Sequence, residues 1–237
     1  MTKQHYIFDF DGTLIDSMRV HGEKIYHLFR LEGIEPPPDI LNILTPLGDK
    51  GALPYIRAHF PVRMSEEEIT AAFDAYAKPR YENDIPLKDG VLDYLNYLKQ
   101  EGKQLYILTA SPHYLVDPCM KRLGLCPLFD GAWSCEEFGT VKSDPTLFHR
   151  VAAHIGASMD ELVFFDDNRI AVETARGAGL TTVGVFDPTS EKDRARIAAV
   201  ADRYVNTLDE LIGVTLQVRI KTARHRPKGR CRAVFLS

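Results

Sequence analysis

Short apolar segments alternate with longer amphipathic ones along most of the chain. Segments rich in β-branched and aromatic residues lie at 6–10, 104–110, 161–167, 181–186 and 202–205, with a shorter one around 132–133. The run from Tyr6 to Phe10 is interrupted by a single polar residue, Asp9, and such runs are typical of strands buried on both faces. Helical patterns fill the intervals at 89–101, 111–124, 144–156, 168–179 and 190–200. Alternating strands and helices predict an α/β fold, in which a parallel sheet carries helices on both faces.

Residues 16–84 interrupt this alternation with helical patterns alone. Helices are predicted at 16–33, 39–45, 50–60 and 65–82, and the last begins with Ser65 and Glu68 in the spacing of a capping box. Because the first strand belongs to the sheet, this stretch is predicted to be an insertion that leaves the sheet and returns to it. The predicted units are an α/β core of residues 1–15 and 85–212, an all-helical cap of residues 16–84, and a C-terminal tail of residues 213–237.

Charge is distributed unevenly over the 237 residues, of which 29 are basic and 33 acidic. Seven basic residues and no acidic ones lie at 214–237, so the rest of the chain carries 22 basic residues and a formal charge of −11. An acidic body argues against nucleic acid as a partner. The basic tail is expected to be a solvated extension.

Composition places the chain among ordinary soluble proteins, with 45% hydrophobic and 26% charged residues. The four cysteines, Cys119, Cys126, Cys135 and Cys231, lack the paired spacing of a metal site and are too few for a disulfide scaffold. No apolar signal core or bilayer-length apolar run is present. We therefore expect a cytoplasmic protein with no membrane partner, and the sequence does not indicate its oligomeric state.

Polar residues lie at or just beyond predicted strand ends or helix starts. These residues are Asp9, Asp11, Thr109, Lys142, Asp166 and Asp167. Ligands of an open parallel sheet bind outside the carboxyl ends of its strands, so these side chains are expected to converge. Asp9 and Asp11 are two residues apart and are predicted to project to the same side of one strand. Neighbouring carboxylates are costly to bury unless a cation or a shared proton lies between them. Three or four carboxylates with one lysine and one hydroxyl predict an oxygen-lined site for Mg²⁺ and a phosphate group.

Four segments carry a family resemblance. "DFDGTLIDS", "ILTAS", a lysine further on, and "FFDDN…AVETARGAG" resemble, in this order, the four motifs of the haloacid dehalogenase superfamily. The resemblance covers residues 5–212 and points to the helical-cap phosphatase branch, which includes phosphoglycolate phosphatases and β-phosphoglucomutase-like proteins. It implies a Rossmann-like core and a phosphoric monoester hydrolase that acts on a small phosphorylated metabolite. One departure is Ser143, where many relatives have proline after the lysine.

The resemblance also implies roles for the acidic residues. Asp9 would be the nucleophile that forms an aspartyl phosphate, and Asp11 would act as general acid and then as general base. Mg²⁺ would be held by the Asp9 side chain, the Asp11 backbone carbonyl and the Asp166–Asp167 pair, with Asp166 as the first choice for the direct ligand. Asn168 is interpreted as a helix cap rather than a ligand.

The remaining motif residues are expected to contact the phosphoryl group. Thr109 and Ser111 would hydrogen-bond its oxygens near the start of the following helix, and Lys142 would serve as a fixed cation. Gly12 would permit a sharp turn after the first strand and lie against the substrate.

Two residues of the predicted cap are weaker candidates for substrate binding. His21 follows the first motif where sugar-phosphate mutase relatives and some phosphatases carry histidine, and Lys50 lies where helical caps carry a substrate-reading loop. A phosphosugar mutase remains an alternative function because of His21. A non-catalytic binding protein on this scaffold is a further alternative. A dehalogenase is disfavoured, because that branch uses neither the second aspartate of the first motif nor Mg²⁺.

Overall fold

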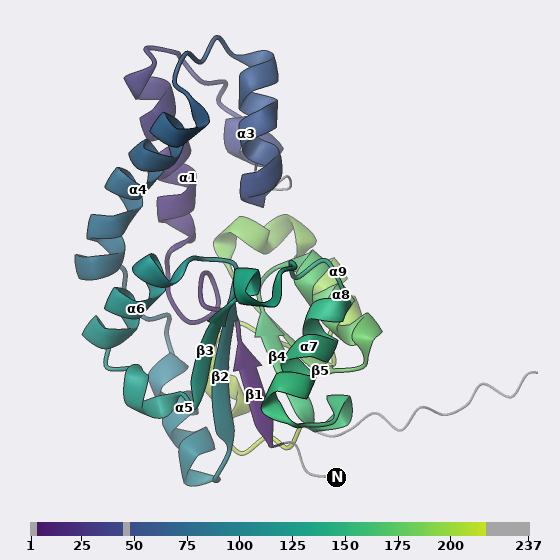
Figure 1. Cartoon of the computed structure of the whole chain (residues 1–237). Coiled ribbons are helices and arrows are strands. Elements are labelled where there is room, and N and C mark those ends of the chain that lie inside the picture. Colours follow the sequence, from purple (N-terminus) through teal and green to yellow (C-terminus); the bar gives the residue numbers. More distant parts are fainter. Residues whose placement is uncertain (1–3, 45–47, 217–237) are drawn as a thin grey trace, which may run out of the picture.

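The first strand of the chain lies in the middle of a parallel sheet. The computed structural model describes residues 4–44 and 48–216. Its strands are β1 (His5–Phe8), β2 (Gln104–Thr109), β3 (Gly131–Ser134), β4 (Leu162–Asp166), β5 (Thr181–Val185) and β6 (Arg203–Val205). They pair in the order β3-β2-β1-β4-β5-β6, and every neighbouring pair is parallel (Figure 1). The predicted α/β fold is confirmed.

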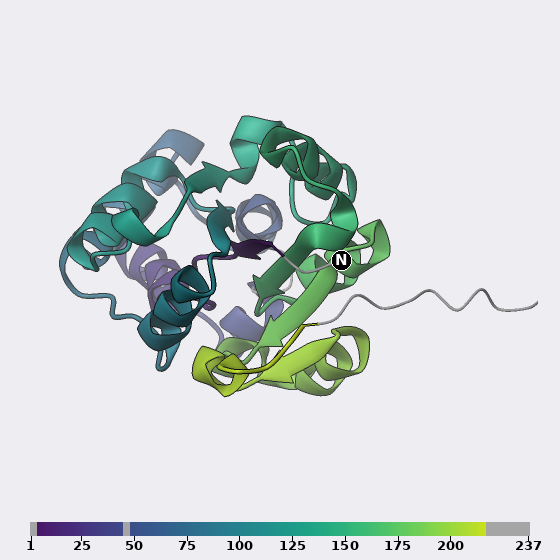
Figure 2. The same cartoon turned by 90° about the horizontal axis from the view of Figure 1, so that it is seen from below.

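Helices cover both faces of the sheet, which explains the apolar runs in its strands. They are α5 (Val91–Gln100), α6 (His113–Arg122), α7 (Thr146–Ile155), α8 (Arg169–Ala178) and α9 (Arg194–Val200). Successive side chains of β1 point to opposite faces, so Phe8 packs with α5 and α6 while Ile7 packs with α7 and α8. Phe8 also stacks on Phe165 of β4, with ring centroids 4.3 Å apart. Figure 2 shows these layers from below.

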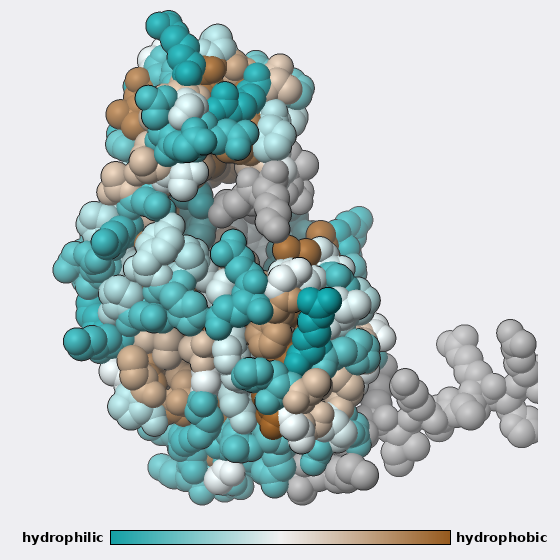
Figure 3. All heavy atoms as spheres, viewed as in Figure 1, coloured by the Kyte–Doolittle hydropathy of each residue, from teal (hydrophilic) through white to brown (hydrophobic). Residues whose placement is uncertain are grey.

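Residues between β1 and α5 form a helical cap that stands beyond one end of the sheet (Figure 1). Its helices are α1 (Met18–Leu31), α2 (Ile40–Leu44), α3 (Gly48–His59) and α4 (Glu66–Asn83). They bury an apolar cluster of their own, which includes Leu28, Ile56 and Ile69. The predicted capping box is present at the start of α4, with Ser65 and Glu68 as its two partners. On the face seen in Figure 3, the surface of the molecule is mostly hydrophilic.

Two chain segments join the cap to the core, and they pair with each other. The Asp16 N–H donates to the Pro86 carbonyl at 3.0 Å, and the Lys88 N–H donates to the Leu14 carbonyl at 3.0 Å. Ile15 forms an antiparallel bridge with Leu87 between these bonds. The outgoing and returning segments are therefore held side by side next to the carboxyl end of β1.

One predicted helix begins later than the sequence pattern indicates. Residues Pro188–Asp193 form a 3-10 helix, and α9 begins only at Arg194. The side chain of Asp187 accepts the Thr189 N–H at 2.9 Å, and this local bond favours a tight turn over a continuous α-helix.

Within the described ranges, no helix has the length and apolarity needed to cross a membrane. Most of the predicted basic tail lies outside the described residues.

Candidate active site

Three aspartates meet at the carboxyl ends of the two central strands. Asp9 follows β1 directly, Asp166 ends β4, and Asp167 follows it. All three are buried, and one carboxylate oxygen from each lies within 4.8 Å of the others. The parallel pairing of β1 with β4 fixes this arrangement, since the Asp9 N–H also donates to the Phe165 carbonyl at 2.9 Å.

Lys142 brings a positive charge into this cluster from the segment before α7. Its Nζ lies 2.8 Å from Asp166 Oδ2 and also contacts Asp9 Oδ1. The side chain is 13% exposed, so the contacts are made largely out of water. Ser143, the departure from the family pattern, does not displace the lysine from the carboxylates.

Lys142 cannot neutralise the cluster if all three carboxylates are ionised. Burial raises the pKa of Asp9 to about 8, although Lys142 lowers it and Asp166 raises it further. Burial and the neighbouring Asp166 and Asp9 also hold the pKa of Asp167 well above its usual range. Burial lowers the pKa of Lys142, but Asp166 and Asp9 outweigh it, so the amine stays protonated. Three carboxylates that ionise together only beside a further positive charge suit a small divalent cation.

Asp11 faces different surroundings, which corrects the prediction that it shares a strand face with Asp9. The strand ends at Phe8, and the chain turns at Gly12 with a φ of +75°. The Asp11 carboxylate accepts hydrogen bonds from Ser17 and Ser111, each at 2.6 Å, and from the Tyr81 hydroxyl. Burial raises the pKa of Asp11, but hydrogen bonds and a contact with His21 at 3.5 Å hold it well below the usual range. Its side chain lies outside the Asp9–Asp166–Asp167 group.

Gly12 makes the turn possible and lies against the acidic cluster. A Cβ at this position would lie 2.9 Å from Asp167 Cγ and 2.9 Å from Met18 Cγ, too close for any side chain. Its carbonyl accepts a hydrogen bond from Lys88 Nζ at 2.6 Å. Only glycine combines this left-handed backbone with such close packing.

Thr109 and Ser111 lie at the end of β2, beside Asp11. Both side chains are buried, and the Ser111 N–H donates to Thr109 Oγ1 at 3.0 Å. Ser111 Oγ donates to Asp11, so this segment links β2 to the turn after β1. The N-terminus of α6 follows two residues later, and its free N–H groups favour a negatively charged ligand.

Of the two cap residues predicted to bind substrate, His21 is the one whose side chain the structure describes. His21 reaches the site, where its Nε2 lies 2.9 Å from the Tyr81 hydroxyl and 3.5 Å from Asp11 Oδ1. Lys50 belongs to α3, and its side chain lies outside the described part of the structure.

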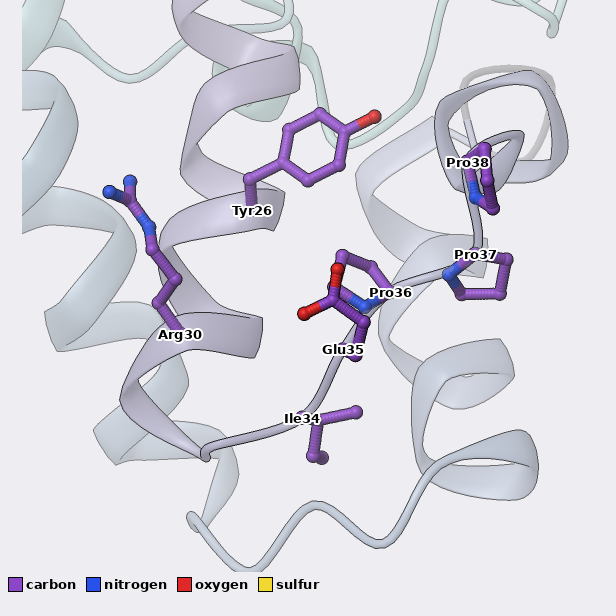
Figure 4. Close-up of a pocket in the computed structure, with 7 residues that line it drawn as sticks. All are labelled: Tyr26, Arg30, Ile34, Glu35, Pro36, Pro37 and Pro38. Carbon is purple, nitrogen blue, oxygen red and sulfur yellow. The ribbon is translucent and has the colours of Figure 1, made fainter.

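A cavity of about 390 Å³ lies in the cap, apart from these residues. It is bounded by Tyr26 and Arg30 of α1 and by the segment 34–38. In Figure 4, Tyr26 points toward this segment, whereas the guanidinium of Arg30 points away from it. The cavity therefore does not belong to the carboxylate site.

Sequence reasoning missed two residues that hold the site together. Lys88 Nζ donates to Gly12 O and Phe186 O, both at 2.6 Å, and to Asp187 at 3.0 Å. Tyr81 hydrogen-bonds Asp11 from the end of α4. Neither lies in a motif, and the only sequence signal is their place near the end of the inserted segment. Asn168, in contrast, caps α8 as predicted, accepting the N–H groups of Ile170 and Ala171.

The chain is similar to known proteins along most of its length. The family model described as haloacid dehalogenase-like hydrolase matches residues 6–185. The chain is 27% identical over 208 residues to validoxylamine A 7'-phosphate phosphatase of Streptomyces hygroscopicus subsp. limoneus, covering 86% of this chain and 94% of the relative. It is 23% identical over 212 residues to a phosphorylated carbohydrates phosphatase of Thermotoga maritima, covering 87% and 98%.

A solved structure shares the fold along most of the chain. CbbY from Rhodobacter sphaeroides in complex with phosphate superposes with a TM-score of 0.75 at 20% identity, covering 89% of this chain and 96% of that one. The family model spans most of the residues that build the sheet, the cap and the carboxylate cluster. This chain belongs to the haloacid dehalogenase-like hydrolases.

Proposed function

We propose that the protein is a Mg²⁺-dependent phosphatase that hydrolyses a small phosphate monoester through an aspartyl phosphate on Asp9. The observation that carries this proposal is the buried group of Asp9, Asp166 and Asp167 with Lys142 against it. All three carboxylates can be ionised together only beside a further cation, and an ionised nucleophile held beside two cations is suited to attack on an anionic substrate. The names of the curated relatives support a phosphorylated substrate, with phosphorylated carbohydrates as the leading class.

The donor set fits Mg²⁺, which prefers oxygen ligands. Both oxygens of Asp166 are engaged, Oδ2 by Lys142 at 2.8 Å and Oδ1 by the Asn168 N–H at 2.7 Å. Within the described residues, no group donates a hydrogen bond to the Asp167 carboxylate. We therefore favour Asp167 over Asp166 as the direct ligand, together with Asp9 and the Asp11 carbonyl. When bound, the metal would neutralise charge on the phosphoryl oxygens and on Asp9.

The protein residues divide the reaction into two steps. A bound phosphate group would place negative charge beside Asp11 and so favour its protonated form. In the first step, Asp9 attacks phosphorus while the bond to the leaving oxygen breaks, and protonated Asp11 gives that oxygen its proton. In the second, Asp11 takes a proton from water as the water oxygen bonds to phosphorus and Asp9 is released. Lys142 and Thr109 would hold the phosphoryl oxygens throughout, whereas Ser111, predicted to do the same, donates its hydroxyl proton to Asp11. A phosphosugar mutase would share the first step but would transfer the phosphoryl group to a sugar hydroxyl.

Rapid-quench kinetics on two variants tests the assignment. Asp9→Asn should form no phosphoenzyme, because an amide is a poor nucleophile. Asp11→Asn should release up to one equivalent of phenolate from an aryl phosphate and then turn over slowly, because dephosphorylation lacks its base. A burst from Asp9→Asn but not from Asp11→Asn would reverse the two roles.

Metal dependence and product analysis complete the test. Activity should disappear in a chelator and return with Mg²⁺, whereas the larger Ca²⁺ should support it poorly. With phosphorylated carbohydrates, the product should be inorganic phosphate; a rearranged sugar phosphate instead would favour the mutase. Full turnover in the chelator would refute the metal requirement.

A further inference from the structure

The two carboxylate oxygens of Asp11 are held differently. Oδ1 accepts hydrogen bonds from Ser17 Oγ at 2.6 Å and from the Tyr81 hydroxyl, and His21 Nε2 lies 3.5 Å away. Oδ2 accepts a hydrogen bond from Ser111 Oγ at 2.6 Å, and no other described group donates to it. Ser111 follows β2 at the strand-end site, whereas Tyr81 and His21 belong to cap helices. One oxygen is therefore fixed by the cap, and the other faces the core.

Tyr81 is anchored on both sides of the junction between cap and core. Its side chain is fully buried in the last turns of α4. Its backbone carbonyl accepts hydrogen bonds from Arg122 of α6 at 3.2 and 3.3 Å, and Arg122 also donates to the Ile85 carbonyl at 2.5 Å. The hydroxyl position is thus set by contacts with the core as well as by the cap helix.

The single proton of the Tyr81 hydroxyl determines the direction of the hydrogen bonds. The hydroxyl donates to Asp11 Oδ1, so its oxygen accepts from His21 Nε2 at 2.9 Å. This assigns the His21 proton to Nε2. Burial and the adjacent Asp11 hold the pKa of Tyr81 well above its usual range, so the hydroxyl remains a donor. Tyr81 therefore lies between His21 and the carboxylate that the proposed reaction uses twice.

We propose that Tyr81 is a positioning residue that orients Asp11, holding Oδ1 so that Oδ2 exchanges the proton with the leaving group and with water. The proposal rests on the proposed function, in which Asp11 is the acid and base. For the first step Asp11 is protonated on Oδ2, with Ser111 Oγ turned to accept from it, and this proton passes to the leaving oxygen as the bond from that oxygen to phosphorus breaks. In the second, Oδ2 takes a proton from the water that attacks phosphorus. The Tyr81 proton stays on its own oxygen, and Tyr81 acts only through Asp11.

The test is the variant Tyr81→Phe, which removes one oxygen from a buried ring. Steady-state turnover of an alkyl phosphate, whose leaving group needs a proton, should fall at least about tenfold, since general acid–base catalysis contributes about 10²–10⁴-fold. The phenolate burst with p-nitrophenyl phosphate, whose leaving group needs little protonation, should keep its rate within about threefold. A merely structural defect would slow both substrates alike.

Tyr76→Phe is a matched control from the same helix. The Tyr76 hydroxyl donates to Glu23 of α1 at 2.7 Å, so its removal also deletes one hydrogen bond between α1 and α4. Its turnover with both substrates should equal that of the wild type. The proposal is overturned if Tyr81→Phe behaves like Tyr76→Phe, or if it slows the alkyl turnover and the aryl burst by the same factor.

A second variant keeps the proposal testable if Tyr81→Phe does not fold, as judged by circular dichroism. His21→Asn withdraws the group that donates to Tyr81 and should cause the same selective loss with the alkyl phosphate. If His21→Asn lowered the alkyl phosphate turnover and the rate of the p-nitrophenyl phosphate burst by the same factor, the positioning role would be contradicted. The proposed function fails separately, if the wild-type protein forms no phosphoenzyme from either substrate.

Discussion

Replacing Lys142 with methionine removes the amine from the carboxylate cluster and keeps an unbranched side chain. Lys142 Nζ lies 2.8 Å from Asp166 and contacts Asp9, and all three groups are largely buried. In metal-free Lys142→Met, the carboxylates of Asp9, Asp166 and Asp167 would face one another without that charge. We expect a large loss of stability in the absence of a metal, along with loss of activity.

The magnitude follows from the geometry. Two unit charges at the 2.8 Å separation of Lys142 and Asp166 attract by roughly 6 kcal/mol at an effective dielectric constant of about 20, before desolvation is counted. Removing one partner of a buried ion pair costs about 3–5 kcal/mol net. Lys142→Met should therefore lower the free energy of unfolding by about 3–5 kcal/mol in a chelator, against a typical total of about 5–15 kcal/mol.

Urea denaturation in a chelator and in saturating Mg²⁺ measures this loss. A ligand at about 100 times its Kd adds about 2.7 kcal/mol to the free energy of unfolding. Lys142→Met should gain more from Mg²⁺ than the wild type does, because its carboxylates lack their internal cation and bind the metal more tightly. The difference in stability between variant and wild type should therefore narrow when Mg²⁺ is added.

Lys99→Met is the matched control for losing a lysine that forms an ion pair. Lys99 lies 3.0 Å from Asp130, but both side chains are about one-third exposed. Its replacement should cost less than about 1 kcal/mol, with or without Mg²⁺. Equal losses in the two variants, or equal stabilisation of wild type and Lys142→Met by Mg²⁺, would refute the view that Lys142 neutralises the cluster.

Two further predictions concern the surroundings of the site. Gly12→Ala should reduce kcat at least about tenfold and lower the free energy of unfolding by about 1–3 kcal/mol, because the added Cβ would press on Asp167 and the backbone is left-handed. Steady-state kinetics checks the first effect, and urea denaturation checks the second. His113 donates hydrogen bonds to Asp117 and Glu137, and these bonds raise its pKa, so its stabilising contribution is present below the unfolded value of 6.5 and is lost as pH rises through the folded value. His113→Gln should therefore destabilise the protein at pH 5.5 by less than about 1 kcal/mol and have no effect at pH 9; an equal effect at both pH values would contradict this.

The sequence was sufficient for features that depend on local pattern and chain order. Apolar runs identified the strands, and the alternation with helices identified the parallel sheet. Because parallel strands end at one edge, the positions of Asp9 and Asp166 at strand ends predicted that their side chains lie together, as they do. The capping box of Ser65 and Glu68 predicted the start of α4, because a capping box depends only on residues close together in sequence.

Features that depend on contacts between segments far apart in sequence could not be predicted from local pattern and chain order. The direction of the Asp11 side chain follows from β1 ending at Phe8 and from a turn that packs on the cap, so the period of two along a strand does not apply to it. Tyr81 is one of ten tyrosines, and only tertiary structure shows that its hydroxyl reaches Asp11. Lys88 joins Gly12 to Phe186, a contact between residues far apart in sequence.

The central place of β1 has a consequence for synthesis of the chain. β1 is made before the other five strands of this sheet, yet its partners are β2 and β4, which follow the whole cap. At a translation rate of about 5–20 residues per second, β4 is made on the order of 10 s after β1. During that time an apolar strand with two unpaired edges is exposed, while α1–α4 can already bury their own cluster. The nascent chain is thus most open to aggregation before β4 is made, and a chaperone that shields residues 5–10 would act in that interval.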